Sequence, residues 1–212
     1  MKTDDLIAAL AADTRPPRPV ASRLLTQAGA GLILSAGLVL AALGLRPDLG
    51  AAMVGPVTSL KWLLPLALSA AGLIAALRLS RPTALPRLTE AWLPAGIAAF
   101  SAFLLAAALA RMPADLRLGA VMGDSAAVCL ISVIAIGSVP LGLGLAVLRG
   151  GASPRPGLSG AMAGLAAGGA AAAAYAMHCD EDAPSFFLVW YGIGIIAMTT
   201  AGWAIGRRTL RW

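Results

Sequence analysis

The chain contains six apolar runs, each about as long as a helix that crosses a lipid bilayer, and these runs constrain its fold more than any other feature. A bilayer core about 30 Å thick is crossed by roughly 20 residues of α-helix. Lys61, near the end of one run, is the only Asp, Glu, Lys or Arg inside them. With 59% hydrophobic and 12% charged residues, the sequence predicts an all-α, polytopic membrane helix bundle. The predicted spans cover residues 24–45, 57–77, 91–110, 125–148, 159–178 and 186–206.

The basic residues alternate between the gaps that separate these runs. Twelve lie in one set of gaps, which includes both chain ends, and four lie in the other set. By the positive-inside rule, the richer set and both termini are expected on the cytoplasmic side. The poorer set also holds six of the ten acidic residues. Its charged residues are Arg46, Asp48, Lys61, Arg111, Asp115, Arg117, Asp124, Asp180, Glu181 and Asp182.

The net charge of +6 does not indicate a nucleic-acid-binding protein. The basic residues are spread over four short segments that flank the apolar runs, rather than gathered on one face. We therefore expect the lipid bilayer as the surrounding medium and no direct contact with nucleic acid.

Residues 1–14 precede the first apolar run and have the pattern of a short amphipathic helix. It has three apolar residues on one face and two acidic residues in the first turn: Leu6, Ile7, Leu10, Asp4 and Asp5. Such a helix could lie on the lipid surface or dock onto a cytoplasmic partner. Three acids against one lysine are the wrong charge for anionic headgroups, which favours the docking peptide.

The segment 15–19 that follows contains three prolines, which stiffen a chain into an extended spacer. The sequence thus predicts an arm with its spacer over residues 1–20 and a six-helix transmembrane domain over residues 21–212. The acidic residues of the arm and the late start of the first apolar run are not typical of a cleavable signal, so we expect the arm to remain.

The fifth apolar run carries glycines at four-residue steps, at Gly160, Gly164 and Gly168. One side of this helix is nearly bare backbone, which allows another helix to approach closely. Packing inside the molecule is the favoured interpretation and a dimerisation face the alternative, so the pattern leaves the oligomeric state open. Prolines inside three other runs predict bent helices and no reaction.

The two cysteines are predicted at the same membrane face, because Cys129 lies about one turn into the fourth span and Cys179 lies at the end of the fifth. On the extracytoplasmic side, two thiols can persist as a disulfide if their Cα atoms approach to roughly 4.4–6.8 Å. They can also bind a soft metal ion, with His178, Asp180 and Asp124 as additional candidate ligands. His178 and Cys179 can share one ion only if the helix end frays, because adjacent helical residues point about 100° apart. The alternative to a sensor or metal site is purely structural: Cys129 would be a small apolar side chain in a packed helix, and His178 a polar side chain at the membrane interface.

Other function classes lack the residues that their chemistry needs. An ion-coupled transporter should carry ionisable groups near the middle of the membrane, and the spans have none. A quinone-linked thiol oxidase should carry close cysteine pairs, and the two cysteines are single. No hydrolase or phosphate-transfer motif is present. We therefore expect no catalysis and no obligatory cofactor, with a transporter and a membrane thiol oxidoreductase kept as alternatives.

Four features occur together over the whole chain: the opening sequence MKTDDLIAALAAD, the proline spacer, the six spans and the placement of Cys129 and Cys179. In this combination the chain resembles the NrsF family of bacterial membrane anti-sigma factors. The resemblance implies a protein of the inner membrane that holds an extracytoplasmic-function (ECF) sigma factor inactive and releases it when the two cysteines sense heavy metal or oxidant. The arm would then dock the sigma factor through Lys2, Thr3, Asp4, Asp5, Leu6, Ile7 and Leu10. A transient heavy-metal ion at the cysteines would be the only ligand.

Overall fold

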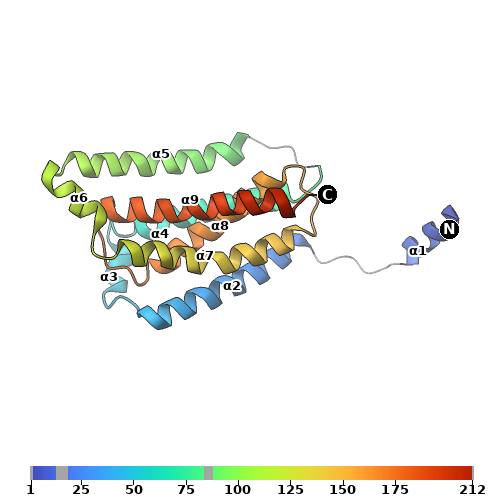
Figure 1. Cartoon of the computed structure of the whole chain (residues 1–212), viewed down its shortest axis with the longest axis horizontal. Helices are drawn as coiled ribbons and strands as arrows, with labels where there is room; N and C mark the ends of the chain where they lie inside the picture. The colour runs from blue at the N-terminus through green and yellow to red at the C-terminus, as the bar shows by residue number, and fades with distance from the viewer. Residues whose placement is uncertain (1, 13–18, 84–87, 212) are drawn as a thin grey trace.

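The computed structural model describes residues 2–12, 19–83 and 88–211, and this part of the chain is helical without strands (Figure 1). Six of its helices are long and apolar enough to cross a membrane. They are α2 (Val20–Leu43), α4 (Leu60–Leu79), α5 (Leu88–Ala110), α7 (Ala126–Leu148), α8 (Pro156–Tyr175) and α9 (Pro184–Thr209). The prediction of an all-α bundle with six membrane-spanning helices is therefore confirmed.

Three shorter helices complete the fold: α1 (Thr3–Ala12) in the arm, α3 (Leu49–Val54) and α6 (Ala114–Met122). Of the helix expected over residues 1–14, the segment Thr3–Ala12 is helical, and Met1, Asp13 and Thr14 lie outside the described residues. Hydropathy did not predict α3 and α6, because both lie in the gaps between spans. Helix α6 begins directly after Pro113, which occupies the N-cap position and has no backbone N–H to leave unpaired.

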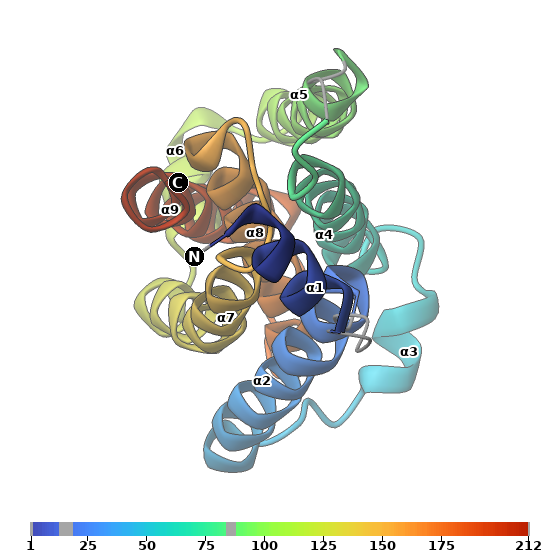
Figure 2. The same ribbon diagram turned by 90° about the vertical axis from the view of Figure 1, so that its right-hand side faces the viewer.

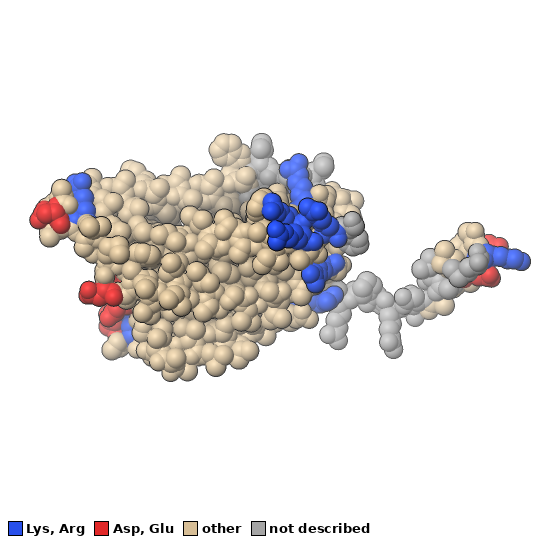
Figure 3. All heavy atoms as spheres, viewed as in Figure 1, with Lys and Arg blue, Asp and Glu red and all other residues tan. Residues whose placement is uncertain are grey.

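The two ends of the bundle differ in charge (Figure 3). We call the end that holds α3, α6 and the loop between α8 and α9 the acidic end, since Asp48, Asp115 and Asp182 lie there. The opposite end carries most of the arginines, among them Arg149 and Arg207, and we call it the basic end. Chain segments that are far apart in sequence therefore share one charge environment, as the alternation of basic residues predicted.

Helix α8 lies at the centre of the bundle, where α2, α4, α7 and α9 pack around it (Figure 2). Its residues are mostly alanine and glycine, and most of them are buried. In α5, by contrast, no residue from Ala91 to Ala110 is buried. Small side chains let four neighbours approach one helix. Helix α5 packs mainly on α4 and α9. It leaves a cavity of about 510 Å³ beside them, lined by apolar residues such as Pro65, Pro94 and Ile195.

The row formed by Gly160, Gly164 and Gly168 on α8 packs against α9 of the same chain. A Cβ atom added at Gly160 would collide with the carbonyl oxygen of Gly202, and one added at Gly164 with the carbonyl oxygen of Met198. Gly168 lies against Ile195, where an added Cβ would come within 3.1 Å of the Cα atom. The two helices are therefore in backbone contact over about two turns, which is the packing that a row of glycines permits.

Replacing Gly164 by alanine is expected to destabilise the bundle by about 2 kcal/mol, because the added methyl group forces two helices apart. Unfolding of the purified protein in SDS, followed by circular dichroism, measures this change. The matched control is Gly142→Ala in α7, where the added Cβ would meet no atom within 4 Å. An equal loss of stability in both variants would contradict the close packing of α8 on α9.

Candidate functional site

The two cysteines lie in one buried cluster at the acidic end. Cys129 is in the first turn of α7 and Cys179 lies beyond the end of α8, with 0% and 2% of their surfaces exposed. Both are free thiols. Tyr175 and Tyr191 belong to the same cluster, with their ring centroids 6.2 Å apart. The structure therefore brings together the two thiols that the sequence placed at one membrane face.

Helix α8 ends at Tyr175, three residues before the predicted end of its span. His178 and Cys179 consequently lie outside the helix, which is the condition under which both could face one ion. The imidazole of His178 is instead paired through Nδ1 with the carbonyl oxygen of Gly44 at 2.9 Å. It also packs against the ring of Tyr175, with centroids 5.6 Å apart.

The other predicted metal ligands do not join the thiols. Asp180 and Asp124 are exposed, and His178 is half-buried. Throughout residues 2–12, 19–83 and 88–211, no group of three or more His, Cys, Asp and Glu side chains is placed to hold a metal ion. The part of the predicted set that the fold buries in one cluster is the cysteine pair, which is the donor set of a soft metal.

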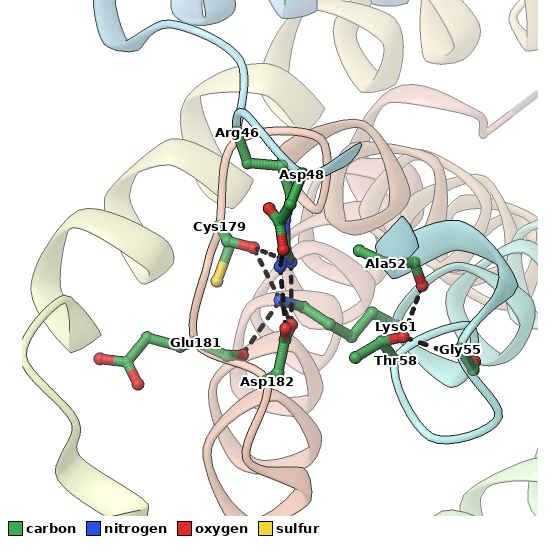
Figure 4. Close-up of polar contacts among 9 residues, drawn as sticks. All are labelled: Arg46, Asp48, Ala52, Gly55, Thr58, Lys61, Cys179, Glu181 and Asp182. Carbon is green, nitrogen blue, oxygen red and sulfur yellow. Dashed lines mark hydrogen bonds and ion pairs between the residues drawn. The ribbon is translucent and has the colours of Figure 1, made fainter. Parts of the chain in front are cut away.

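A buried lysine for which the sequence predicted no role lies beside Cys179 (Figure 4). Lys61, in the first turn of α4, has 0% of its surface exposed. Its ammonium group donates to the carbonyl oxygen of Cys179 at 2.7 Å, to that of Glu181 at 3.0 Å and to the Asp182 carboxylate at 3.0 Å. An ammonium group has three N–H donors, so its hydrogen-bonding capacity is fully used.

Arg46 binds the same loop from the other side. Its guanidinium forms paired hydrogen bonds of 2.8–2.9 Å with the carboxylates of Asp48 and Asp182. One of its nitrogens also donates to the carbonyl oxygen of Cys179 at 2.9 Å. Five contacts satisfy its five N–H donors, and the guanidinium side chain is only 2% exposed. Two cations and two carboxylates thus form a neutral cluster that holds the backbone of Cys179.

The ion pairs shift the pKa values of the charged groups in this cluster. Hydrogen bonds from Arg46, and then from Lys61, lower the pKa of Asp182 to about 2. The same contacts raise the pKa of Arg46 above its usual range, with Asp182 as the larger cause and Asp48 as the smaller, while Arg46 lowers the pKa of Asp48. All three groups are therefore charged at neutral pH.

The loop after α8 also ties the remaining elements of the acidic end together. The carboxylate of Glu181 accepts a hydrogen bond from the backbone N–H of Asp124 at 2.8 Å, just before α7. The Ser185 hydroxyl and the Trp190 indole, both in α9, donate to the last turns of α6 at 2.9 and 2.8 Å. Residues 178–190 hence contact α2, α4, α6 and α7 or the loops beside them.

Helix α1 exposes the apolar face predicted for it. Leu6 is 43% exposed and Ile7 is 59% exposed, and no helix of the described bundle packs along α1. Asp5 accepts a hydrogen bond from the backbone N–H of Lys2 at 3.3 Å, so this carboxylate stabilises the first turn. Thr3 and Asp4 are exposed in the same turn. Leu10 is helical, and its side chain lies outside the described residues.

These features define a polytopic helical membrane protein with a buried thiol pair at one end and an exposed amphipathic helix at its amino terminus. The chain belongs to the NrsF family, described as "Negative regulator of sigma F", which matches residues 10–212. It is therefore a regulatory protein of the anti-sigma factor family and not an enzyme.

Two relatives match over the full length of both chains. One is the anti-sigma-F factor NrsF of Caulobacter vibrioides (strain NA1000 / CB15N), 39% identical over 219 residues. The other is the probable anti-sigma-F factor NrsF of Azospira oryzae, 37% identical over 224 residues. No solved structure matches the chain. Both relatives also align with residues 1–9, which precede the segment matched by the family description.

Proposed function

We propose that this protein holds an ECF sigma factor inactive at the cytoplasmic face of the inner membrane and releases it when Cys129 and Cys179 react with heavy metal or oxidant. The family and the names of its relatives support the anti-sigma part of this proposal. The observation that carries the sensing part is the burial of both thiols in one cluster at the acidic end.

The charge distribution supports the orientation. Arginines gather at the basic end, where α2 begins and α9 ends (Figures 1 and 3). By the positive-inside rule this end faces the cytoplasm, together with α1. The thiols then lie at the extracytoplasmic end, where oxidised sulfur persists and external metal arrives first.

The sigma factor is proposed to bind α1. An exposed amphipathic helix with two apolar side chains, Leu6 and Ile7, suits the apolar groove of a helix-binding partner. Asp4 and Asp5 suit basic residues at the rim of such a groove. Because α1 does not pack on the described bundle, this face is free for a partner.

Reaction at the sulfur atoms changes the packing of the acidic end. An oxidant that accepts two electrons joins the sulfurs as the thiols release two protons, and a soft divalent metal displaces the same two protons to bind two thiolates. Either product draws α7 and the loop after α8 together. Since α8 and α9 are in backbone contact up to the basic end, they are suited to move as one unit and carry the displacement across the membrane.

The energetic requirement is modest. Changing the bound fraction of a partner from about 99% to about 1% takes about 5.5 kcal/mol of difference between the two states. A structural zinc site with its full set of ligands contributes about 10–16 kcal/mol, so a two-thiolate site needs to supply only a part of that free energy.

A thiol-free variant tests the sensing proposal, since Cys129 and Cys179 are the only cysteines. We expect Cys129→Ser/Cys179→Ser to retain the sigma factor in a pull-down from detergent, because both sites are buried and serine is of similar size. Addition of cadmium or peroxide should release the partner from the parent protein and leave it bound to the variant. Release from both proteins would show that the stimulus acts elsewhere.

A further inference from the structure

Two buried cations donate to a single carbonyl oxygen, that of Cys179 (Figure 4). Lys61 reaches it from α4 and Arg46 from the loop between α2 and α3, at 2.7 and 2.9 Å. The backbone N–H of Cys179 donates to the carbonyl oxygen of Tyr175 at 3.1 Å. Both the N–H and the C=O of Cys179 are therefore hydrogen-bonded, although this residue lies beyond the end of α8.

Stability alone is a weak explanation for this cluster. Well-packed apolar side chains often stabilise an interior as much as a buried ion pair does. The ion pairs do, however, fix geometry. Asp182 accepts from Lys61 through Oδ1 and from Arg46 through both Oδ1 and Oδ2, and this shared carboxylate sets the distance between the two donors. The position of the Cys179 backbone follows from that distance.

We propose that Lys61, Arg46 and Asp182 are positioning residues that keep Cys179 withdrawn in the buried cluster and connect its backbone to α4 and to the loop after α2. The proposal rests on the proposed function only in treating Cys179 as a sensor thiol. Displacement of Cys179 would then break charged contacts to two other elements at once, so the cluster sets the threshold at which this thiol becomes reactive.

The test measures the reaction rate of Cys179 with N-ethylmaleimide in the full-length protein in lipid nanodiscs, in a Cys129→Ser background. Lys61→Met removes one of the two donors to the Cys179 carbonyl and should raise the rate about tenfold. The double variant Lys61→Met/Asp182→Asn should do the same while it keeps the cluster neutral, since Arg46 retains Asp48. Arg111→Gln, an exposed basic residue at the same end, is the control and should leave the rate unchanged.

A second reporter separates release of Cys179 from general loosening of the bundle. In a Cys129→Ser/Cys179→Ser background, Ala163→Cys introduces a buried thiol into another core cluster, in the half of α8 nearer the basic end. Its labelling rate should be unaffected by the double variant. Equal acceleration at both thiols would overturn the positioning role, and so would an unchanged Cys179 rate.

This assay contains neither the sigma factor nor a stimulus. A thiol-free protein that still releases its partner would refute the sensing proposal and leave the labelling result standing. Slow labelling of Cys179 in the Lys61 variants would refute the positioning proposal and leave sensing intact.

Discussion

Replacing Asp182 by alanine is expected to lower the free energy of unfolding by about 3 kcal/mol, the largest stability change predicted for this protein. The substitution removes the carboxylate that pairs with Lys61, and it leaves Arg46 with Asp48 as its partner among the described residues. A buried cation without its partner typically costs about 3–5 kcal/mol, and the lower value applies because 35% of the Asp182 side chain is exposed.

Unfolding in SDS at pH 7 measures this loss, with Asp115→Ala as the control. Asp115 is exposed in α6 at the same end of the bundle, so its removal should change the free energy by less than about 0.5 kcal/mol. Similar curves for both variants would contradict the importance of the cluster.

The pKa of Asp182 adds a pH dependence to this expectation. Its folded-state pKa, about 2, lies below the ordinary value of 3.8, so the ionised carboxylate stabilises the fold above that value. This contribution is lost as the pH falls from about 4 towards 2. The difference between the parent protein and Asp182→Ala should therefore stay constant from pH 5 to 8 and shrink below pH 4.

Replacing both exposed apolar residues of α1, as Leu6→Asp/Ile7→Asp, is expected to weaken capture of the sigma factor at least about 100-fold. Each substitution puts a charge where the partner is proposed to bury an apolar side chain, and two central contacts of this kind are together worth more than about 3 kcal/mol. The affinity can be measured by titrating labelled sigma factor into the protein in nanodiscs.

The matched control adds the same two charges on the opposite face of α1, as Ala8→Asp/Ala12→Asp. It should retain most of the affinity. Because α1 does not pack on the described bundle, both variants should unfold in SDS like the parent protein. Equal loss of binding in both would mean that net charge, and not the apolar face, governs docking.

The membrane spans were predictable because lipid permits few solutions. An apolar segment of about 20 residues that crosses a bilayer on its own does so as a helix, because lipid offers its backbone no other hydrogen-bond partners. The predicted span 125–148 accordingly corresponds closely to α7 (Ala126–Leu148). The end of α8 was predicted three residues late. Residues 176–178 are compatible with both a helix and a turn, and the contacts of His178 with distant residues select the turn.

The functional site was predictable in part. The depth of Cys129 and Cys179 followed from their positions in the spans, whereas the cluster around Lys61 did not. Lys61 and Arg46 are 121 and 136 positions away from Asp182, and they meet it only because α2 and α8 end where α4 begins. A single lysine inside an apolar run was the available signal, since an ionisable residue at that depth requires a partner.

The contrast between α5 and α8 has a consequence for how the protein tolerates mutation. Lipid surrounds most of α5, and a fluid solvent accepts any apolar shape, so a saturation library should allow free exchange among leucine, isoleucine, valine and phenylalanine there. At the buried glycine and alanine positions of α8, the same library should recover almost only glycine, alanine and serine, because four packed helices surround α8. Hydrophobicity alone would be under selection in the one helix, and volume in the other.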